Sequence, residues 1–356
     1  MLFRFKPIAV AAGLMGLVSS DVLMAENDWI KGVSVDGLLK IAAVYGNDYY
    51  EKDTSDIIVH TAILGINAQL NQWASGRFSY KYEENKTDLS VDDGYITLGD
   101  HANGLPAYLR MGQFVVPFGN FTSHMNSDPL TLVMGESAEK AVQLGFNASG
   151  AYGSVFGYNG ATQDDNNDTI DHYGGNIGFA KDMGQFSVDV GVSYLSDFGD
   201  TGTLSAALEP AMMSPLSPAY DYVAGLGAHL IVKAGPAFFI GEYITALDPF
   251  EPEYLAFKGE GAEPQVWNTE AGLTFNMAGQ ELTLALGYQA TEEAVGLMEP
   301  RASHLPESRI LGTVAMEIYE NTTVSIEYAV SEDYDVEDGG TGEDAESASL
   351  VLAVEF

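Results

Sequence analysis

The stretch S-A-S-L-V-L-A-V-E-F, residues 347–356, decides the fold. Side chains alternate between the two faces of an extended strand, so the even positions from 348 to 356, all apolar, share one face. The odd positions of the same stretch include Ser349 and Glu355. The same two-residue alternation recurs along the whole sequence, which indicates that this stretch is one strand of a large antiparallel sheet.

Sixteen segments with this alternation follow one another along the chain. They lie near residues 33–45, 58–70, 77–83, 89–99, 107–116, 140–148, 151–159, 172–181, 185–196, 221–233, 237–247, 265–277, 281–291, 309–319, 323–332 and 347–356. An even number of antiparallel strands is what a single-chain bacterial outer-membrane barrel requires. The sequence therefore predicts an all-β fold, a transmembrane antiparallel β-barrel of about 16 strands.

The connections between these segments are of two kinds. Some are tight turns rich in Gly or Asn, such as K-D-M-G at 181–184 and M-A-G-Q at 277–280, which suit hairpins. The longer ones cover residues 117–139, 160–171, 197–220, 248–264, 291–308 and 333–346. Short connections that alternate with long ones predict short periplasmic turns and long extracellular loops.

The distribution of charge tests this prediction in the eight most regular strands. Their predicted lipid-facing sets are the odd positions of 33–45 and 267–275 and the even positions of 58–70, 186–194, 282–288, 310–318, 324–330 and 348–356. None of these positions carries a charged residue, and a Lys or Arg that faces lipid at mid-bilayer costs about 2–4 kcal/mol. A soluble antiparallel sandwich also alternates, but here the less apolar face is rich in Gly, Ser, Thr, Asn and acids, which suits a water-filled interior.

Composition and the first residues limit the remaining choices. The chain of 356 residues has no Cys, and its 51 Asp and Glu against 15 Lys and Arg make nucleic acid an unfavourable partner. Arg4 and Lys6 precede an apolar run at residues 8–18, which is shorter than the about 20 residues that a membrane-spanning helix needs. We therefore expect a secretory signal peptide over residues 1–25, with cleavage after Ala25 or at Ser20, and a barrel over 26–356. A retained anchor is the alternative.

Motifs for chemistry are weak. Ser123–His124 and Ser303–His304 are neighbours in loops, and sequence neighbours are rarely a nucleophile and its base. The six His residues lack metal-ligand spacing. The acidic runs at 164–168 and 332–344 would attract cations, but solvated loop tips explain them more simply. We expect no enzymatic activity, no cofactor and no metal site.

The loop after the fifth strand, which is the third loop at the predicted extracellular end, differs from the others because it is apolar. Residues 112–137 read G-Q-F-V-V-P-F-G-N-F-T-S-H-M-N-S-D-P-L-T-L-V-M-G-E-S, and a proline ends strand pairing at the start of the loop. Folding into the lumen would bury these side chains and narrow the channel, whereas an extracellular loop packed on its neighbours is the alternative. The predicted constriction residues are Pro117, Phe118, Phe121, His124 and Asp128.

Inward-facing charges also suggest a channel. The predicted pore-lining basic residues are Lys40, Arg77, Lys81 and Arg110. The predicted pore-lining acidic residues are Asp189, Glu242, Glu270, Glu317 and Glu327. Because the basic group comes from the first five strands and the acidic group from the ninth onward, the two walls would impose a transverse field on polar solutes. Chance scatter of charges is the alternative.

Several motifs resemble those of a known family. G-Q-x-x-x-P-F-G at 112–119, S-D-P-L-T at 127–131, G-E-S at 135–137 and G-A-Y-G-S-V-F-G-Y-N-G at 150–160 resemble the LbtU-like siderophore porins of Gram-negative outer membranes. The final strand, which ends in Phe356, is similar to the terminal signature of bacterial outer-membrane barrels.

This resemblance implies a multi-pass outer-membrane barrel that contacts lipid and lipopolysaccharide and admits a ferric siderophore passively, without a plug domain. A homotrimer would be usual for such a porin. The expected function is passive uptake of a small hydrophilic solute. The alternatives are a general porin, an anion or phosphate-type porin, or a closed barrel whose acidic loops serve binding or adhesion.

Overall fold

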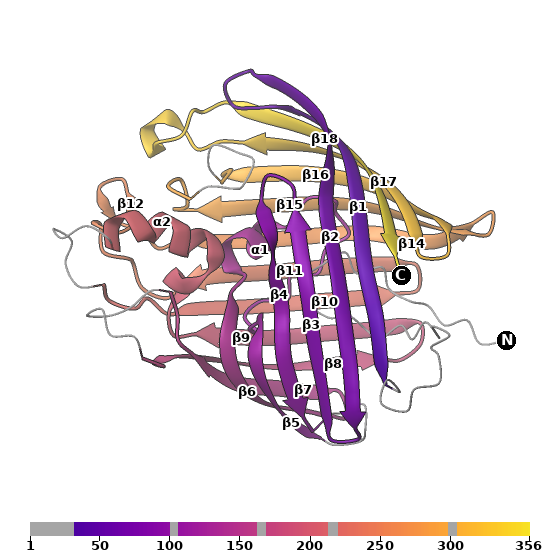
Figure 1. The fold of residues 1–356 in the computed structure, drawn as a ribbon. Helices are drawn as coiled ribbons and strands as arrows, with labels where there is room; N and C mark the ends of the chain where they lie inside the picture. The colour runs from indigo at the N-terminus through magenta and orange to yellow at the C-terminus, as the bar shows by residue number, and fades with distance from the viewer. Residues whose placement is uncertain (1–31, 100–105, 162–168, 213–219, 298–304) are drawn as a thin grey trace.

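The computed structural model describes residues 32–99, 106–161, 169–212, 220–297 and 305–356. Sixteen antiparallel strands close into one barrel, and a separate two-stranded sheet lies in a loop (Figure 1). The prediction of a closed 16-stranded antiparallel barrel is confirmed. No helix in these ranges is long and apolar enough to span a membrane.

The first eight barrel strands are β1 (Val33–Asn47), β2 (Asp53–Asn71), β3 (Ala74–Glu83), β4 (Thr87–Leu98), β5 (Ala107–Val115), β6 (Ala138–Ala148), β7 (Ala151–Tyr158) and β8 (His172–Asp182). The other eight are β9 (Phe186–Leu195), β10 (Gly225–Ala234), β11 (Ala237–Ala246), β14 (Gln265–Met277), β15 (Gln280–Glu292), β16 (Ser308–Tyr319), β17 (Thr322–Glu332) and β18 (Asp344–Glu355). The small elements are α1 (Leu130–Gly135), α2 (Gly202–Met212), η3 (Phe198–Asp200), η4 (Val336–Asp338), and the small sheet of β12 (Ala256–Phe257) and β13 (Glu260–Gly261).

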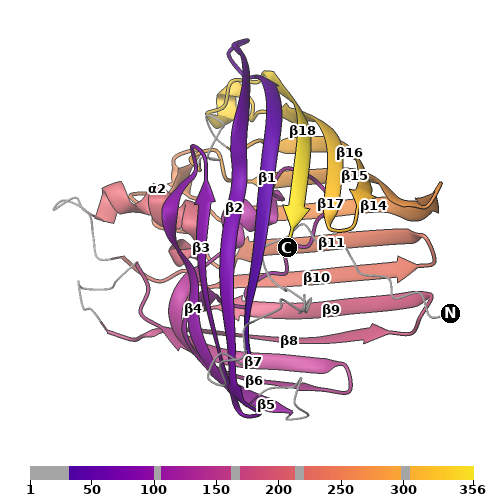
Figure 2. The same cartoon turned by 45° about the vertical axis from the view of Figure 1, so that its right-hand side comes forward.

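The barrel closes where β1 pairs with β18, side by side in Figure 2. The backbone N–H of Gly37 donates to the carbonyl of Phe356 at 2.8 Å, and the N–H of Phe356 donates back at 3.1 Å. The Phe356 ring lies over Gly37 so closely that a Cβ on this glycine would stand 2.3 Å from the ring. Gly37 is therefore needed for space at the seam.

The connections separate by length as predicted, with three exceptions, one of which is the connection over residues 99–106 between β4 and β5 at the tight-turn end. Tight turns such as 149–150, 235–236 and 278–279 join strands at one end, and the longer loops join them at the other. At the long-loop end, however, only residues 48–52 and 84–86 separate the first two strand pairs. In Figure 1 the elements of the long loops, α2 and β12, lie at the end of the barrel opposite the chain's C-terminus.

Strand β10 begins at Gly225, later than the predicted residue 221. The segment before it is held by the preceding loop, because Phe198 donates its N–H to the Val223 carbonyl at 2.6 Å. The buried hydroxyl of Tyr220 also donates to Asp197 at 2.8 Å. Tertiary contacts therefore replace strand pairing in this segment.

The predicted outward faces are confirmed except in β2. Large apolar side chains exposed on the outside include Leu39, Leu64, Val190, Leu286 and Leu350, all at predicted lipid-facing positions.

In β2 the prediction that even-numbered positions face outward is wrong at the start of the strand. Ile58 is 97% buried against Ala42 and Val351 on the inner side. The pairing of β1 with β2 shifts there from Thr61 to Val59, which leaves His60 as the extra residue of a bulge. A one-residue shift moves every following side chain to the other face.

The largest apolar cluster lies between the strands and the long loops. It combines α1, the segment before it, η3, α2 and the loops that follow β11 and β15, with Phe118, Leu130, Leu204, Phe250 and Leu297 among its members. Because these side chains are buried together, the long-loop end of the barrel is packed with protein on this side.

Candidate functional site

Residues 116–137, here called the inner loop, leave the barrel wall after β5 and return to it at β6. The two ends of the loop are joined by the Val116 N–H, which donates to the Ser137 carbonyl at 2.9 Å. Beyond this neck, strand pairing stops and the chain runs across the inner faces of strands β9 to β17. Three inward-facing glutamates bind residues 120–127, here called the outgoing limb. Residues 128–137 form the returning limb.

Glu242 of β11 is the first of these glutamates. Its carboxylate accepts the backbone N–H of Asn120 at 2.5 Å and that of Phe121 at 3.1 Å. The same carboxylate accepts the hydroxyl of Thr131 at 2.7 Å, and Thr131 belongs to α1 on the returning limb. Glu242 therefore ties both limbs of the inner loop to the wall.

Glu270 of β14 is the second. It accepts the backbone N–H of His124 at 2.9 Å and the hydroxyl of Ser123 at 2.5 Å. The amide of Asn268, on the same strand, donates to it at 3.4 Å.

Glu327 of β17 is the third. It accepts the backbone N–H groups of Asn126 at 2.5 Å and Ser127 at 3.1 Å, and the hydroxyl of Ser127 at 2.5 Å. Thr313 of β16 donates a further hydrogen bond to it at 2.8 Å.

The three glutamates thus bind the inner loop at intervals of three residues. Hydrogen bonds to an ionised carboxylate contribute about 1.5–3 kcal/mol each, so the limb is held firmly. The side chains of Glu242, Glu270 and Glu327 are only 5%, 1% and 2% exposed. The expectation that these three acids line an open channel is therefore wrong, because the inner loop covers them.

The returning limb has its own anchors. Arg309 of β16 donates to the Asp128 carbonyl at 2.8 Å, and the Asp128 carboxylate pairs with Lys86 in the connection between β3 and β4. Gln289 of β15 accepts the N–H of Leu130 at 3.2 Å. The inner loop is thus attached to the wall at β16 and to the rim beyond β3.

The predicted constriction residues all lie in the inner loop, but they have different surroundings. Phe118 and Phe121 are buried in the large apolar cluster. His124 and Asp128 are only partly buried, and the His124 ring lies 4.2 Å from that of Phe238. Pro117, where strand pairing has ended, is also partly buried. The two phenylalanines therefore anchor the loop, whereas His124 and Asp128 remain partly accessible.

The predicted basic residues face inward from β1, β3 and β5. Arg77 is held between Asp36 at 3.0 Å and Asp93 at 2.8 Å, and Lys81 pairs with Glu83 at 3.2 Å. These pairs neutralise much of the basic wall, so the predicted field between two opposed free walls is weaker than expected.

Lys40 and Arg110 form no salt bridge within the part of the chain that the structure describes. The Arg110 guanidinium lies over aromatic rings, 4.5 Å from the ring centre of Tyr95, 5.4 Å from Phe114 and 5.7 Å from Tyr108. Of the four predicted basic residues, Lys40 and Arg110 are therefore the two without a salt-bridge partner in the described ranges.

The remaining predicted acids lie nearer the tight turns. Asp189 accepts the hydroxyl of Tyr152 at 2.8 Å and lies 3.3 Å from a ring nitrogen of His229. Glu317 accepts the N–H of Asn321 at 3.0 Å in the turn after β16. The inner loop does not contact either side chain through a hydrogen bond.

Sequence reasoning did not assign roles to Gln289 and Arg309, although both fall on inward positions. Their contacts with the inner loop join residues more than 150 positions apart. The alternation along each strand predicts that Gln289 and Arg309 face inward. It does not predict which inward side chains contact a loop.

Within the described residues, the Ser123–His124 motif does not form a catalytic pair. The Ser123 hydroxyl donates to Glu270 and not to a histidine ring. In the described ranges no group of three or more His, Cys, Asp or Glu side chains is arranged to hold a metal ion. Ser303–His304 and the acidic run 164–168 lie outside the described residues.

The acidic run 332–344 is organised by its own backbone. Asp333 accepts both the N–H and the hydroxyl of Thr341 at 2.6 Å. Beside it, the Tyr334 hydroxyl lies 2.7 Å from that of Thr291 and accepts the Ala294 N–H at 3.2 Å. Burial raises the pKa of Tyr334 to about 12, so this loop is packed onto the one that follows β15.

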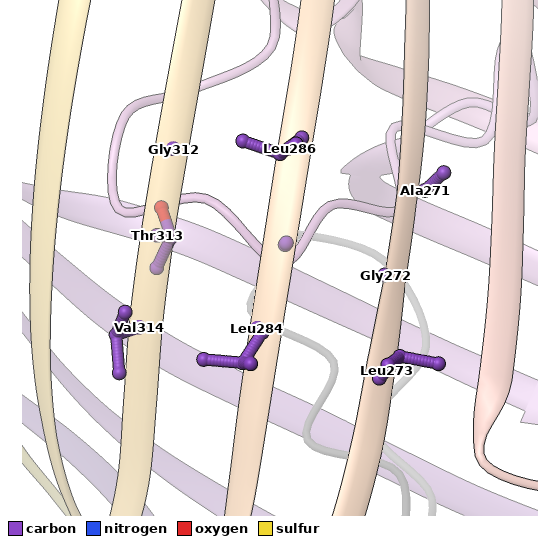
Figure 3. Close-up of a pocket in the computed structure, with 9 residues that line it drawn as sticks. Ala271, Gly272, Leu273, Leu284, Leu286, Gly312, Thr313 and Val314 are labelled. Atoms are coloured by element: carbon purple, nitrogen blue, oxygen red, sulfur yellow. The ribbon is translucent and has the colours of Figure 1, made fainter.

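A shallow hollow of about 350 Å³ lies between strands β14, β15 and β16 (Figure 3). The side chains of Leu273, Leu284, Leu286 and Val314 surround it, with small residues such as Gly272 and Gly312 between them. Its bulky residues belong to the exposed outer face, so the hollow is separate from the inner loop and the lumen.

Comparisons with other proteins agree with the architecture. No protein-family model matches the chain. A UPF0422 protein of Coxiella burnetii is 26% identical over 324 residues, which cover 88% of this chain and 67% of that protein. A UPF0422 protein of Legionella pneumophila strain Lens is 25% identical over 368 residues, covering 91% and 66%. The chain thus spans about two thirds of the length of these relatives.

Solved structures with the same fold include an outer-membrane channel and a porin. The outer-membrane channel DcaP of Acinetobacter baumannii superposes with a TM-score of 0.58 at 13% identity, over 91% of this chain and 97% of that one. An anion-selective porin from Comamonas acidovorans gives 0.60 at 12%, over 91% and 99%. OprB of Pseudomonas putida gives 0.61 at 9%, over 92% and 94%. At these identities the likeness concerns the fold.

Proposed function

We propose that this chain is an outer-membrane porin through which a small hydrophilic solute diffuses passively. The observation that carries the proposal is the inner loop, which three buried glutamates hold inside a closed barrel whose outer face is apolar. A loop fixed in this way narrows an aqueous passage without requiring an energy source.

The outer face supports a membrane setting. Exposed aromatic residues occur towards both ends of the strands, as expected at the two interfaces of a bilayer. Tyr45 lies eight residues along β1 from Gly37, the partner of Phe356, and this spacing corresponds to about 26 Å along a strand. With a strand tilt of about 35–45°, this leaves about 20 Å along the barrel axis, which lies within an apolar band about 25 Å tall.

The inner surface supports a passage along β1 to β4. The inner loop lies against the inner faces of β9 to β17, and the large apolar cluster extends from there to β5, β6 and β7 through Phe114, Ala141 and Phe156. On the wall of β1 to β5, Lys40 and Arg110 have no salt-bridge partner within the described ranges, and Asp128, which pairs with Lys86, lies at the edge of the inner loop that faces this wall. Solutes would cross between this edge and the basic wall.

The solute and the setting of the chain are further parts of the proposal. The motifs shared with LbtU-like siderophore porins favour a ferric siderophore. Lys40 and Arg110, which have no salt bridge in the described part of the chain, instead favour an anion or phosphate-type solute, and a general porin is the broader alternative. We also propose a cleaved signal peptide over residues 1–25, contact with lipid and lipopolysaccharide, and a homotrimer.

Planar-bilayer recording tests the proposal. The folded, heat-modifiable barrel should produce discrete conductance steps. Complete absence of steps from such a barrel would instead favour a closed barrel whose acidic loops serve binding or adhesion. Growth under iron limitation with defined siderophores, with and without this chain, tests the solute.

A further inference from the structure

Three polar side chains from three strands meet on the inner wall, on the turn side of the inner loop. The Tyr152 hydroxyl of β7 lies 2.8 Å from Asp189 Oδ1 of β9 and 3.2 Å from His229 Nε2 of β10. His229 Nε2 also lies 3.3 Å from Asp189 Oδ1. The phenol oxygen, the carboxylate oxygen and the imidazole nitrogen therefore lie at the corners of a nearly equilateral triangle.

Two glycines make this meeting possible. A Cβ on Gly178 of β8 would stand 2.3 Å from the Tyr152 ring, and one on Gly191 of β9 would stand 2.6 Å from His229 Cε1. Neither glycine has a positive φ, so the backbone conformation does not require glycine at either position. Both serve to let Tyr152 lie across β8 and reach the other two side chains.

The three atoms are paired with one another by hydrogen bonds that share few hydrogens. The one hydroxyl hydrogen of Tyr152 is directed to Asp189. The two contacts of His229 Nε2, at 3.2 Å and 3.3 Å, must then share the single hydrogen that this nitrogen carries. The first distance lies at the upper end of the usual N–H···O range, and the second lies slightly beyond it.

We propose that Tyr152, Asp189 and His229 bind a first-row divalent metal ion of the Cu²⁺ or Zn²⁺ type. An ion about 2.1 Å from each of the three atoms would lie about 1 Å from their plane. Three adjacent ligands of an octahedrally coordinated ion have nearly the same arrangement. The ion replaces the phenol hydrogen, which leaves to solvent. The remaining coordination positions face the lumen.

The surroundings allow an ion to enter and leave. The side chains of Asp189 and His229 are 27% and 10% exposed. The charged neighbour of His229 on the next strand is Glu242, its partner in the β10–β11 ladder, which already binds the inner loop. This site depends on the fold and not on conduction through the barrel, so the two proposals fail independently.

Copper titration of the folded full chain in detergent, followed by electron paramagnetic resonance, tests the site. We expect one saturable Cu²⁺ per barrel with a single coordinated nitrogen. His229→Gln and Asp189→Asn should each weaken binding at least tenfold, and Tyr152→Phe severalfold. His124→Gln, whose ring stacks on Phe238, is the matched control and should bind as the wild type does.

The contrary results are equally definite. A wild-type barrel without a saturable site, or a His229→Gln barrel that binds copper as tightly as the wild type, would overturn the proposal. If the Asp189 variant fails to fold, Gly191→Ala provides a second test, because its methyl group displaces the His229 ring while all three donors remain. Unchanged copper binding in a folded Gly191→Ala barrel would also contradict the site.

Discussion

Glu242 and Thr131 join the two limbs of the inner loop. The Thr131 hydroxyl donates to Glu242 Oε2 at 2.7 Å, while Oε1 accepts the Asn120 N–H at 2.5 Å. One buried carboxylate thus fixes both the outgoing limb and the helix on the returning limb. The position of the loop should therefore depend on this group more than on any exposed acid.

Replacing this carboxylate by an amide should loosen the loop. Glu242→Gln loses charge-assisted hydrogen bonds, and we expect a destabilisation of about 2 kcal/mol, with noisier single-channel currents. Glu281→Gln is the control, since Glu281 also faces inward but has no hydrogen bond to the inner loop. Heat-modifiability on gels and bilayer recordings measure the two effects. Equal behaviour of the two variants would show that Glu242 does not fix the loop.

Removing most of the inner loop should widen the passage. Deletion of residues 120–134 removes the segment bound by all three glutamates, so single-channel conductance should rise if the loop is the constriction. An unchanged conductance in a folded deletion variant would place the narrowest point elsewhere.

The seam of the barrel should not tolerate a side chain at Gly37. A methyl group there would meet the Phe356 ring at 2.3 Å, and overpacking of this kind costs about 1–3 kcal/mol. Gly37→Ala should therefore lower the temperature at which the folded gel band is lost. Gly312→Ala is the control, because its nearest neighbour would lie at 3.4 Å. Equal temperatures for both variants would contradict the close contact.

The selectivity of the passage should respond to Arg110. Because this guanidinium has aromatic neighbours and no salt bridge in the described ranges, Arg110→Gln should shift the reversal potential in a salt gradient towards cation preference. Lys140→Gln is a suitable control, since Lys140 is exposed in β6, opposite in parity to the buried inward residue Ala141. A shift of the same size in both variants would refute a role for Arg110 in the lumen.

Alkaline pH should release the loop that contains Tyr334. Its pKa is raised by burial to about 12, whereas a free tyrosine titrates near 10. The neutral phenol therefore stabilises the loop below pH about 10, and this contribution is lost as the pH rises through about 12. Protease cleavage within 333–343 should increase over that interval. Tyr334→Phe should lack this pH-dependent step, and its persistence in that variant would assign the titration to another group.

The barrel itself could be predicted because a period of two survives in nearly every strand. The failure in β2 has a local cause, since the extra residue His60 reverses the faces before it and leaves Ile58 inside. A bulge has no signature in hydrophobic periodicity, so the prediction for that strand could not detect it.

The site was less predictable than the fold. Inward parity correctly identified Glu242, Glu270 and Glu327 as facing the interior, and the apolar composition of the third loop indicated burial. Their pairing with backbone N–H groups of that loop was not predictable, because it joins positions 121 to 201 residues apart in the sequence. Inward acids in such a sequence can serve as loop anchors as well as channel lining.

The seam between β1 and β18 also has a consequence for the order of folding. All other neighbouring barrel strands also follow one another along the sequence, so each pair forms by extending a hairpin. Leu38 of β1 and Glu355 of β18, in contrast, pair from opposite ends of the chain. The entropy of closing so long a loop makes this pairing the slowest to form. Until it forms, β1 and β18 each expose an unpaired edge, and this is the stage at which the nascent barrel is most vulnerable to aggregation.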